Sequence, residues 1–96
     1  MGTGKPYKEL DNSVSLDRKR LKELLDENGI PASYYSLWNE WEHDTIVLID
    51  NYEAILEIFY MDEKGEKVLL KVCPTEAAAC KCIYDYFVND IYWDNM

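Results

Sequence analysis

The first strong pattern along the chain is a helix with one apolar face. Three leucines recur at i, i+3 and i+4, the spacing of a single helix face: Leu21, Leu24 and Leu25. Either Ser15 or Asp17 can cap the N-terminus of this helix. Gly29 suits the left-handed position that follows a helix C-terminus, and Pro31 prevents the helix from continuing. The pattern therefore predicts a helix over residues 15–28.

Three segments rich in β-branched and aromatic residues predict strands in the middle of the chain: Thr45–Asp50, Ala54–Met61 and Glu66–Cys73. The acidic turn before the third of these strands contains Gly65, which we expect to take positive φ in a hairpin. Strict alternation along the third strand places Val68, Leu70 and Val72 on one face of the sheet.

A second helix is predicted after the strands. Thr75 is its expected N-cap, and the helix dipole favours the negative charge of Glu76 in the first turn. Five apolar residues recur at helical spacing in one continuous stripe: Cys80, Ile83, Tyr84, Phe87 and Ile91. This stripe predicts a helix that packs on the sheet through one face.

The element order predicts the fold. The order α-β-β-β-α indicates an α+β domain, in which a three-stranded antiparallel sheet carries both helices on one face. We expect residues 14–96 to form this single domain and residues 1–13 to be a flexible leader. Residues 32–44 predict an irregular connection, with a short turn or strand near Tyr34–Leu37.

Net charge limits the class of partner. The 96 residues include 19 acidic and 10 basic side chains, so the formal net charge is −9. A surface of this sign repels phosphate backbones and anionic lipids, so we expect no nucleic acid and no membrane as partner. The chain has no apolar run near the roughly 20 residues of a spanning helix, and its first residues do not form a signal peptide. We therefore expect a cytoplasmic protein, monomeric by default.

The negative charge is concentrated in the middle of the chain and is mixed with aromatic residues. Residues 32–61 hold six acidic residues and no Lys or Arg. Trp and Tyr dominate binding hot spots, and carboxylates around them select a basic partner. The candidate partner-binding residues are Trp38, Glu40, Trp41, Glu42, Asp44, Asp50, Tyr52 and Glu53. In the alternative interpretation, Trp38 and Trp41 cover the open side of a small core and the carboxylates are merely solvated.

Catalytic and metal chemistry have little support in the sequence. The chain has one histidine, His43, and contains none of the phosphate-loop, nucleophile-elbow, dinucleotide or zinc-protease motifs. Cys73, Cys80 and Cys82 lack the paired spacing of zinc ribbons, and Cys80 lies on the expected core face of the second helix. We therefore predict reduced thiols, no catalytic residue, no metal and no cofactor.

Several segments together resemble small bacterial immunity proteins of polymorphic toxin systems, of the contact-dependent growth inhibition and Rhs types. The segments are Leu21–Pro31, Tyr34–Leu37, Val47–Leu48, Leu56–Tyr60, Lys64–Lys67 and Thr75–Cys80. The resemblance covers about residues 16–90, and it departs from the family at Leu56, where a Trp often precedes the Glu of the central strand. It implies a protein that binds and neutralises one cognate toxin domain, commonly a nuclease. Because such families diversify at the contact surface, the resemblance assigns no binding residue.

Three hypotheses for the function follow. The first is an immunity protein that occludes the active surface of a basic toxin C-terminal domain with acidic and aromatic groups. The alternative is an acidic adaptor or regulatory domain that binds another basic protein or peptide. The third, a small enzyme, is disfavoured because the chain lacks a recognisable catalytic set. An upstream gene for a large secreted protein with a variable C-terminal domain would favour the first hypothesis.

Overall fold

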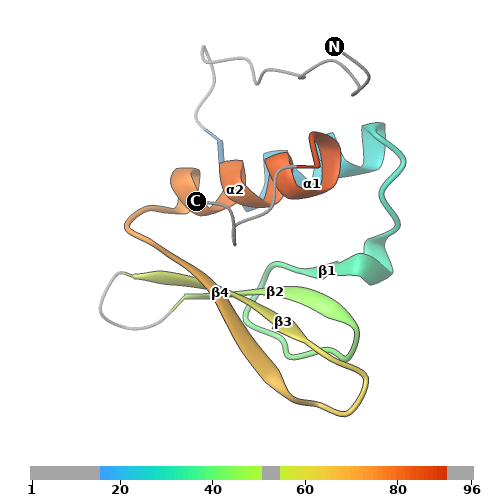
Figure 1. The fold of residues 1–96 in the computed structure, drawn as a ribbon. Coiled ribbons are helices and arrows are strands. Elements are labelled where there is room, and N and C mark those ends of the chain that lie inside the picture. The colour runs from blue at the N-terminus through green and yellow to red at the C-terminus, as the bar shows by residue number, and fades with distance from the viewer. Residues whose placement is uncertain (1–15, 51–54, 91–96) are drawn as a thin grey trace, which may run out of the picture.

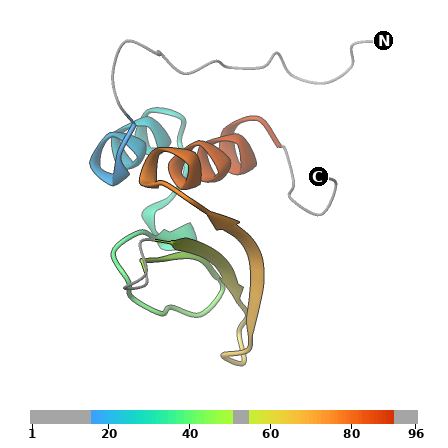
Figure 2. The ribbon, with the colours of Figure 1, turned by 90° about the vertical axis from the view of Figure 1, so that its left-hand side faces the viewer.

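Two helices lie side by side over one face of a four-stranded sheet (Figures 1 and 2). The computed structural model describes residues 16–50 and 55–90, so the expected leader, residues 1–13, lies outside the described residues. The elements are α1 (Arg18–Glu27), the short 3-10 helix η1 (Ala32–Tyr34), β1 (Tyr35–Ser36), β2 (Thr45–Asp50), β3 (Leu56–Met61), β4 (Lys67–Cys73) and α2 (Glu76–Val88). The α+β class and the placement of the helices follow the prediction.

The sheet differs from the prediction in one strand. Its order is β1-β2-β3-β4, and the pairs β2–β3 and β3–β4 are antiparallel as expected. The short strand β1 adds a parallel edge, in which Tyr35 pairs with Ile46 and Ser36 with Val47. The expectation of a three-stranded, purely antiparallel sheet was therefore wrong. A short turn or strand was expected near Tyr34–Leu37, where β1 lies, but its parallel pairing with β2 was not.

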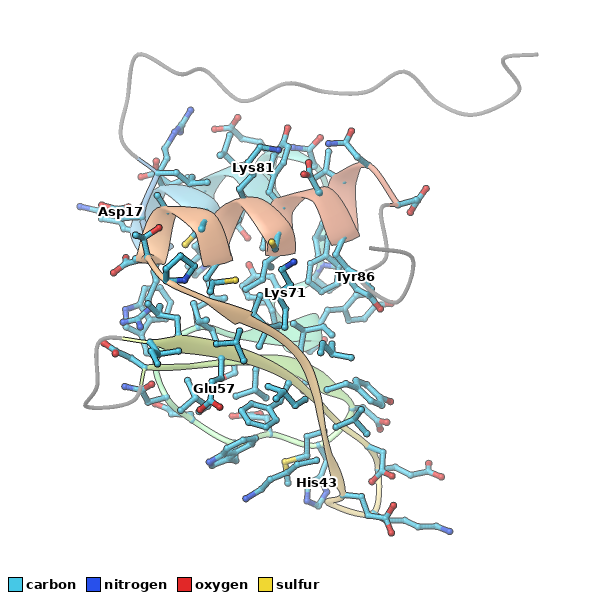
Figure 3. The ribbon with its side chains drawn as sticks, turned by 60° about the vertical axis from the view of Figure 1, so that its left-hand side comes forward. Asp17, His43, Glu57, Lys71, Lys81 and Tyr86 are labelled. Carbon is cyan, nitrogen blue, oxygen red and sulfur yellow. The ribbon has the colours of Figure 1, made fainter. Side chains whose placement is uncertain are left out.

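A bulge changes the faces of β4. Ile58 pairs with Lys71 and Phe59 pairs with Leu69, so Leu70 is an extra residue in β4. The alternation expected for Val68, Leu70 and Val72 was therefore wrong, because a bulge shifts the residues beyond it to the other face. Lys71 lies on the side of β4 toward α2, whereas Glu57 of β3 lies on the opposite side of the sheet (Figure 3).

Both ends of α1 have the predicted caps. The Asp17 carboxylate accepts a hydrogen bond of 2.8 Å from the Arg20 backbone N–H. At the C-terminus Gly29 takes a φ of 77°, and the Ile30 N–H donates to the Leu25 carbonyl at 2.9 Å. These bonds form a Schellman motif, which satisfies carbonyls that the end of a helix leaves unpaired.

The N-termini of the two helices are joined by one side chain. The Thr75 hydroxyl caps α2 by accepting from the Ala78 N–H at 3.1 Å, as predicted. Glu76, in the first turn of α2, accepts a hydrogen bond of 2.9 Å from the Arg18 N–H in the first turn of α1. One carboxylate therefore serves the positive ends of both helix dipoles.

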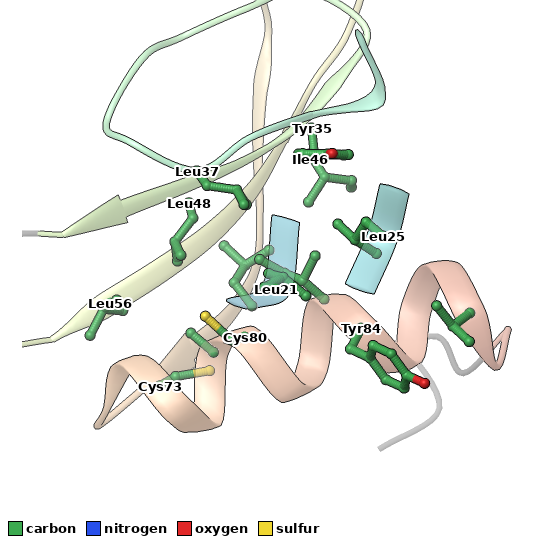
Figure 4. Close-up of a cluster of buried hydrophobic side chains, with 14 residues drawn as sticks. Leu21, Leu25, Tyr35, Leu37, Ile46, Leu48, Leu56, Cys73, Cys80 and Tyr84 are labelled. Carbon is green, nitrogen blue, oxygen red and sulfur yellow. The ribbon is translucent and has the colours of Figure 1, made fainter. Parts of the chain in front are cut away.

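The main core lies between the helices and the sheet (Figure 4). Among its fully buried side chains are Leu21, Leu25, Leu48, Ile58, Cys80 and Ile83. The described residues of the two predicted apolar helix faces belong to this core, except that Leu24 and Phe87 are only partly buried and pack against it, as does Leu70 of β4. Val47 is also fully buried but is not part of this helix-side cluster. The sheet thus buries side chains on both faces.

Truncation of the helix-side core should strongly destabilise the fold. We expect Leu25→Ala and Ile83→Ala each to lower the free energy of unfolding by about 2–5 kcal/mol, because both side chains are fully buried. Chemical denaturation followed by circular dichroism measures this change. Leu69→Ala is the control, since this leucine of β4 is 49% exposed. Equal losses for Leu25→Ala and Leu69→Ala would contradict the described packing.

Candidate functional site

The connection between β1 and β2, residues 37–44, carries most of the candidate partner-binding residues. This connection joins the parallel strands β1 and β2 without a crossover helix. A connection this short is possible because β1 has only two residues, so the chain has little distance to cover back to the start of β2. Asn39 and Asp44 both take positive φ, 61° and 55°, in the left-handed region that Asn and Asp tolerate better than most residues. The Asn39 side chain accepts a hydrogen bond of 2.6 Å from the Asp50 N–H, which holds the connection against β2.

One set of side chains in the connection faces the sheet. The Trp41 ring meets Phe59 of β3 edge to face, with centroids 5.0 Å apart, and the Lys67 ammonium lies 4.1 Å from the Trp41 centroid. His43 lies beside the β3–β4 hairpin, on the side of the sheet away from the helices (Figure 3). Trp41 therefore covers part of the sheet face that points away from the helices. This position matches the alternative interpretation of Trp41 as a residue that covers the core.

The other set of side chains lines a cavity of about 210 Å³. Trp38, Glu40 and Glu42 contribute from the connection, and Tyr35 and Lys22 contribute from β1 and α1. Trp38 is 49% exposed, so its indole is available to a partner. We call this hollow the Trp38 cavity. It is the place where the structure brings predicted site residues together.

The helix-side wall of the Trp38 cavity is held by an ion pair and a hydrogen bond. The Lys22 ammonium contacts the Asp26 carboxylate at 3.1 Å, and the Tyr35 hydroxyl donates to the same carboxylate at 3.3 Å. The hydrogen bond with Asp26 raises the pKa of Lys22, and burial raises the pKa of Tyr35. At neutral pH Lys22 is therefore charged and is already balanced by Asp26.

Asp44 and Asp50 do not line the Trp38 cavity. Asp44 accepts a hydrogen bond of 3.4 Å from the Tyr60 hydroxyl. Burial raises the pKa of Tyr60, and the charge of the Asp44 carboxylate raises it further. Asp50 lies at the end of β2, where it forms an ion pair of 3.7 Å with Arg18. Tyr52 and Glu53 lie outside the described residues. The predicted site is therefore divided among separate surroundings.

The cavity is suited to binding a cation. Because Asp26 balances Lys22, the carboxylates of Glu40 and Glu42 leave the cavity walls with a net negative charge. Neither glutamate forms an ion pair within residues 16–50 and 55–90. An exposed indole beside carboxylates attracts a cation both through its ring face and through direct charge.

The two buried thiols, Cys73 and Cys80, have raised pKa values. All three cysteines are free in the described structure, with Cys73 and Cys80 buried and Cys82 partly buried. Burial, reinforced by Cys82, raises the pKa of Cys73 to about 11, and burial raises the pKa of Cys80 to about 12. A nucleophilic or metal-binding cysteine needs a depressed pKa, which is the opposite shift. The described residues also contain no group of three or more side chains suited to a metal ion.

Sequence reasoning missed an exposed apolar strip on the edge strand β4. Val68, Leu69 and Val72 are each about half exposed, at 52%, 49% and 49%. Ordinary alternation would bury part of this set, and the bulge in β4 has no clear signal in the sequence. Lys67 and Lys71 accompany the strip, and charged side chains on an edge strand oppose pairing with other strands.

Native thiol labelling should follow burial. We expect iodoacetamide to alkylate Cys82 first in the native protein, because the buried Cys73 and Cys80 are protonated at neutral pH and shielded from the reagent. Peptide mass spectrometry measures the order of reaction. In denaturant all three thiols should react. Native labelling of Cys80 as fast as Cys82 would show that Cys80 is not in the core.

The two tryptophans should differ in their effect on stability. We expect Trp41→Ala to lower the free energy of unfolding by about 1–3 kcal/mol, since its ring packs on Phe59. Trp38→Ala should change it by less than about 0.5 kcal/mol, because half of this side chain is solvent-exposed. Urea titrations of both variants provide the comparison. A larger loss for Trp38→Ala would reverse the roles assigned to the two residues.

Comparisons with known proteins leave the site to be interpreted from its own geometry. Neither family models, curated proteins nor solved structures match this chain. None of the described helices has the length and apolar content needed to cross a membrane. The candidate function must therefore rest on the charge, exposure and arrangement of the residues around the Trp38 cavity.

Proposed function

We propose that this protein is an immunity protein of a polymorphic toxin system, which binds a basic toxin domain and blocks its active surface. The observation that carries the proposal is the Trp38 cavity, where an exposed indole stands beside Glu40 and Glu42. The resemblance of several sequence segments to small bacterial immunity proteins favours the same function. Inhibition by occlusion needs a complementary surface and no chemistry of its own.

The charge distribution supports a basic partner. Residues 32–61 contain six acidic residues and no Lys or Arg, within a chain of net charge −9. Such a field attracts a basic domain over a distance of about one Debye length, roughly 8–10 Å at physiological salt. Toxin domains that act on nucleic acids carry basic substrate-binding surfaces, because their substrates are polyanions. A surface that mimics this negative charge competes directly with the substrate.

The aromatic residue supplies the short-range part of the interaction. Exposed Trp side chains are enriched at binding hot spots, where they bury a large area with little loss of conformational freedom. Trp38 is 49% exposed, whereas Trp41, which is 38% exposed, also packs against Phe59 and Lys67. In the proposed complex the carboxylates set the association rate, and desolvation of Trp38 slows dissociation.

The direct test starts from the gene neighbourhood. If an upstream gene encodes a large secreted protein with a variable C-terminal domain, this domain is purified and mixed with the 96-residue chain, and both binding and toxin activity are measured. The proposal expects a tight complex and loss of toxin activity at equimolar ratio. Binding of basic proteins in general, without inhibition of this toxin, would favour the acidic adaptor or regulatory domain instead.

Neutralising the acidic surface should slow association. We expect the triple variant Glu40→Gln, Glu42→Gln and Asp44→Asn to lower the association rate constant about tenfold at low salt and to flatten its salt dependence. Stopped-flow binding at several salt concentrations measures both effects.

The matched control removes the same number of charges elsewhere. Glu23→Gln, Glu27→Gln and Glu63→Gln change three exposed carboxylates on α1 and the β3–β4 hairpin. Circular dichroism establishes that both triple variants are folded. If the two variants associate at equal rates, the net charge and not the surface around the Trp38 cavity governs the encounter, and this surface is the wrong one.

A further inference from the structure

The Trp38 cavity has the size of a receptor for one side chain. Its volume of about 210 Å³ lies below the roughly 300–1,000 Å³ of pockets that enclose drug-sized ligands. A long side chain from a partner surface can enter a hollow of this size.

We propose that the Trp38 cavity receives one arginine side chain of the basic partner. This inference rests on the proposed function, and it adds the chemical group that the partner inserts. Glu40 and Glu42 supply the negative charge, and the exposed indole of Trp38 supplies a flat aromatic face. A guanidinium group is planar, stacks on aromatic rings and binds carboxylates in a bidentate manner, so it matches both features.

Lysine is a poorer match than arginine. Its ammonium is a compact and strongly hydrated charge, which loses more hydration in a partly enclosed site and cannot stack on the indole. The cavity also already has a lysine in its wall. The Lys22 ammonium is paired with the Asp26 carboxylate at 3.1 Å, and the Tyr35 hydroxyl donates to the same carboxylate. Lys22 therefore does not neutralise the charge of Glu40 and Glu42.

Other occupants conflict with the lining. An anion would meet the uncompensated carboxylates of Glu40 and Glu42. A purely apolar side chain would desolvate these carboxylates without pairing them, which is costly. A calcium ion takes six to eight oxygen ligands, and the described residues contain no group of three or more side chains that could hold a metal. An arginine side chain satisfies the carboxylates and the aromatic ring together.

The test uses a single arginine in place of the partner. N-acetyl-L-arginine amide is titrated into the full-length, ¹⁵N-labelled protein, and the indole N–H signals of Trp38 and Trp41 are followed by NMR. We expect saturable movement of the Trp38 signal with a dissociation constant in the millimolar range, as is typical of so small a ligand. The Trp41 signal should move much less, because its ring lies against Phe59 and Lys67.

Two further ligands isolate the chemistry. N-acetyl-L-citrulline amide has nearly the same shape without the charge, and we expect its affinity to be at least about tenfold lower. N-acetyl-L-lysine amide keeps the charge without the plane, and we expect it to bind about threefold to tenfold more weakly than the arginine compound. Equal affinity of all three ligands would mean that the cavity does not recognise guanidinium, and would overturn the inference.

Variants of the protein locate the binding. Glu40→Gln together with Glu42→Gln should weaken arginine binding about tenfold, as should Trp38→Ala. The control pair, Glu63→Gln with Glu66→Gln, removes two exposed carboxylates from the β3–β4 hairpin and should leave affinity within about twofold. If the control pair weakens binding as much as the cavity pair, arginine binds through general charge and the inference fails.

The inference and the proposed function can fail separately. Saturable arginine binding in the cavity, with no binding of the neighbouring toxin domain, would overturn the proposed function and keep the arginine receptor. Tight toxin binding, with no Trp38 response to arginine and no change in toxin dissociation for Trp38→Ala, would overturn the receptor and keep the proposed function. In the expected case, Trp38→Ala raises the dissociation rate of the toxin about 30-fold, the size of a binding hot spot.

Discussion

The parallel pairing of β1 with β2 constrains the whole candidate site. After β1 the chain must return to the start of β2 within residues 37–44, and no helix fills this return. The path between the strands takes positive φ at Asn39 and at Asp44. The same path turns Trp41 toward Phe59 and leaves Trp38 with Glu40 and Glu42 around a cavity. The position of each functional side chain thus follows from a two-residue strand.

Acidic residues on the helices are largely paired with basic residues, whereas, in the part of the chain that the structure describes, Glu40 and Glu42 in the β1–β2 connection are not. Many basic side chains of the helices have acidic partners one turn away, such as Lys22 with Asp26 at 3.1 Å and Lys81 with Asp85 at 2.9 Å. Such exposed pairs add little stability, but they cancel charge locally. Residues 32–61 contain no basic residue of their own, and although Asp50 pairs with Arg18, neither Glu40 nor Glu42 has an ion pair within the described residues. The uneven distribution of lysine and arginine along the chain therefore concentrates the negative electrostatic potential around residues 32–61.

Local signals in the sequence predicted most of the fold. The strand Thr45–Asp50 and the caps at Asp17, Gly29 and Thr75 occur where the pattern placed them, because alternation and capping depend on neighbouring residues. The parallel pairing of the short strand expected near Tyr34–Leu37, and the bulge at Leu70, did not follow from the pattern. Both features depend on which strand lies alongside, and a single strand's sequence does not encode its neighbour.

The sequence indicated which residue types would form the candidate site, but it did not indicate how their side chains are arranged. Glu40, Glu42 and Trp38 line one cavity, whereas Asp44 and Asp50 contact Tyr60 and Arg18. Two tryptophans three residues apart would share a face in a helix, but in this connection one faces the sheet and the other a cavity. Composition alone could not separate them, because the separation depends on the backbone turn at Asn39.

The two tryptophans therefore act as parts of one unit. Trp41 packs on the sheet, and Asn39 between them binds the Asp50 N–H at 2.6 Å, while the Ser36 hydroxyl donates to the Glu40 carbonyl at 2.6 Å. These contacts hold the connection before any partner arrives. A binding loop that is already ordered loses less conformational entropy on association than a loop that must fold onto its partner. In the proposed complex, the packing of Trp41 on Phe59 would keep the connection, and with it Trp38, in place before the partner binds.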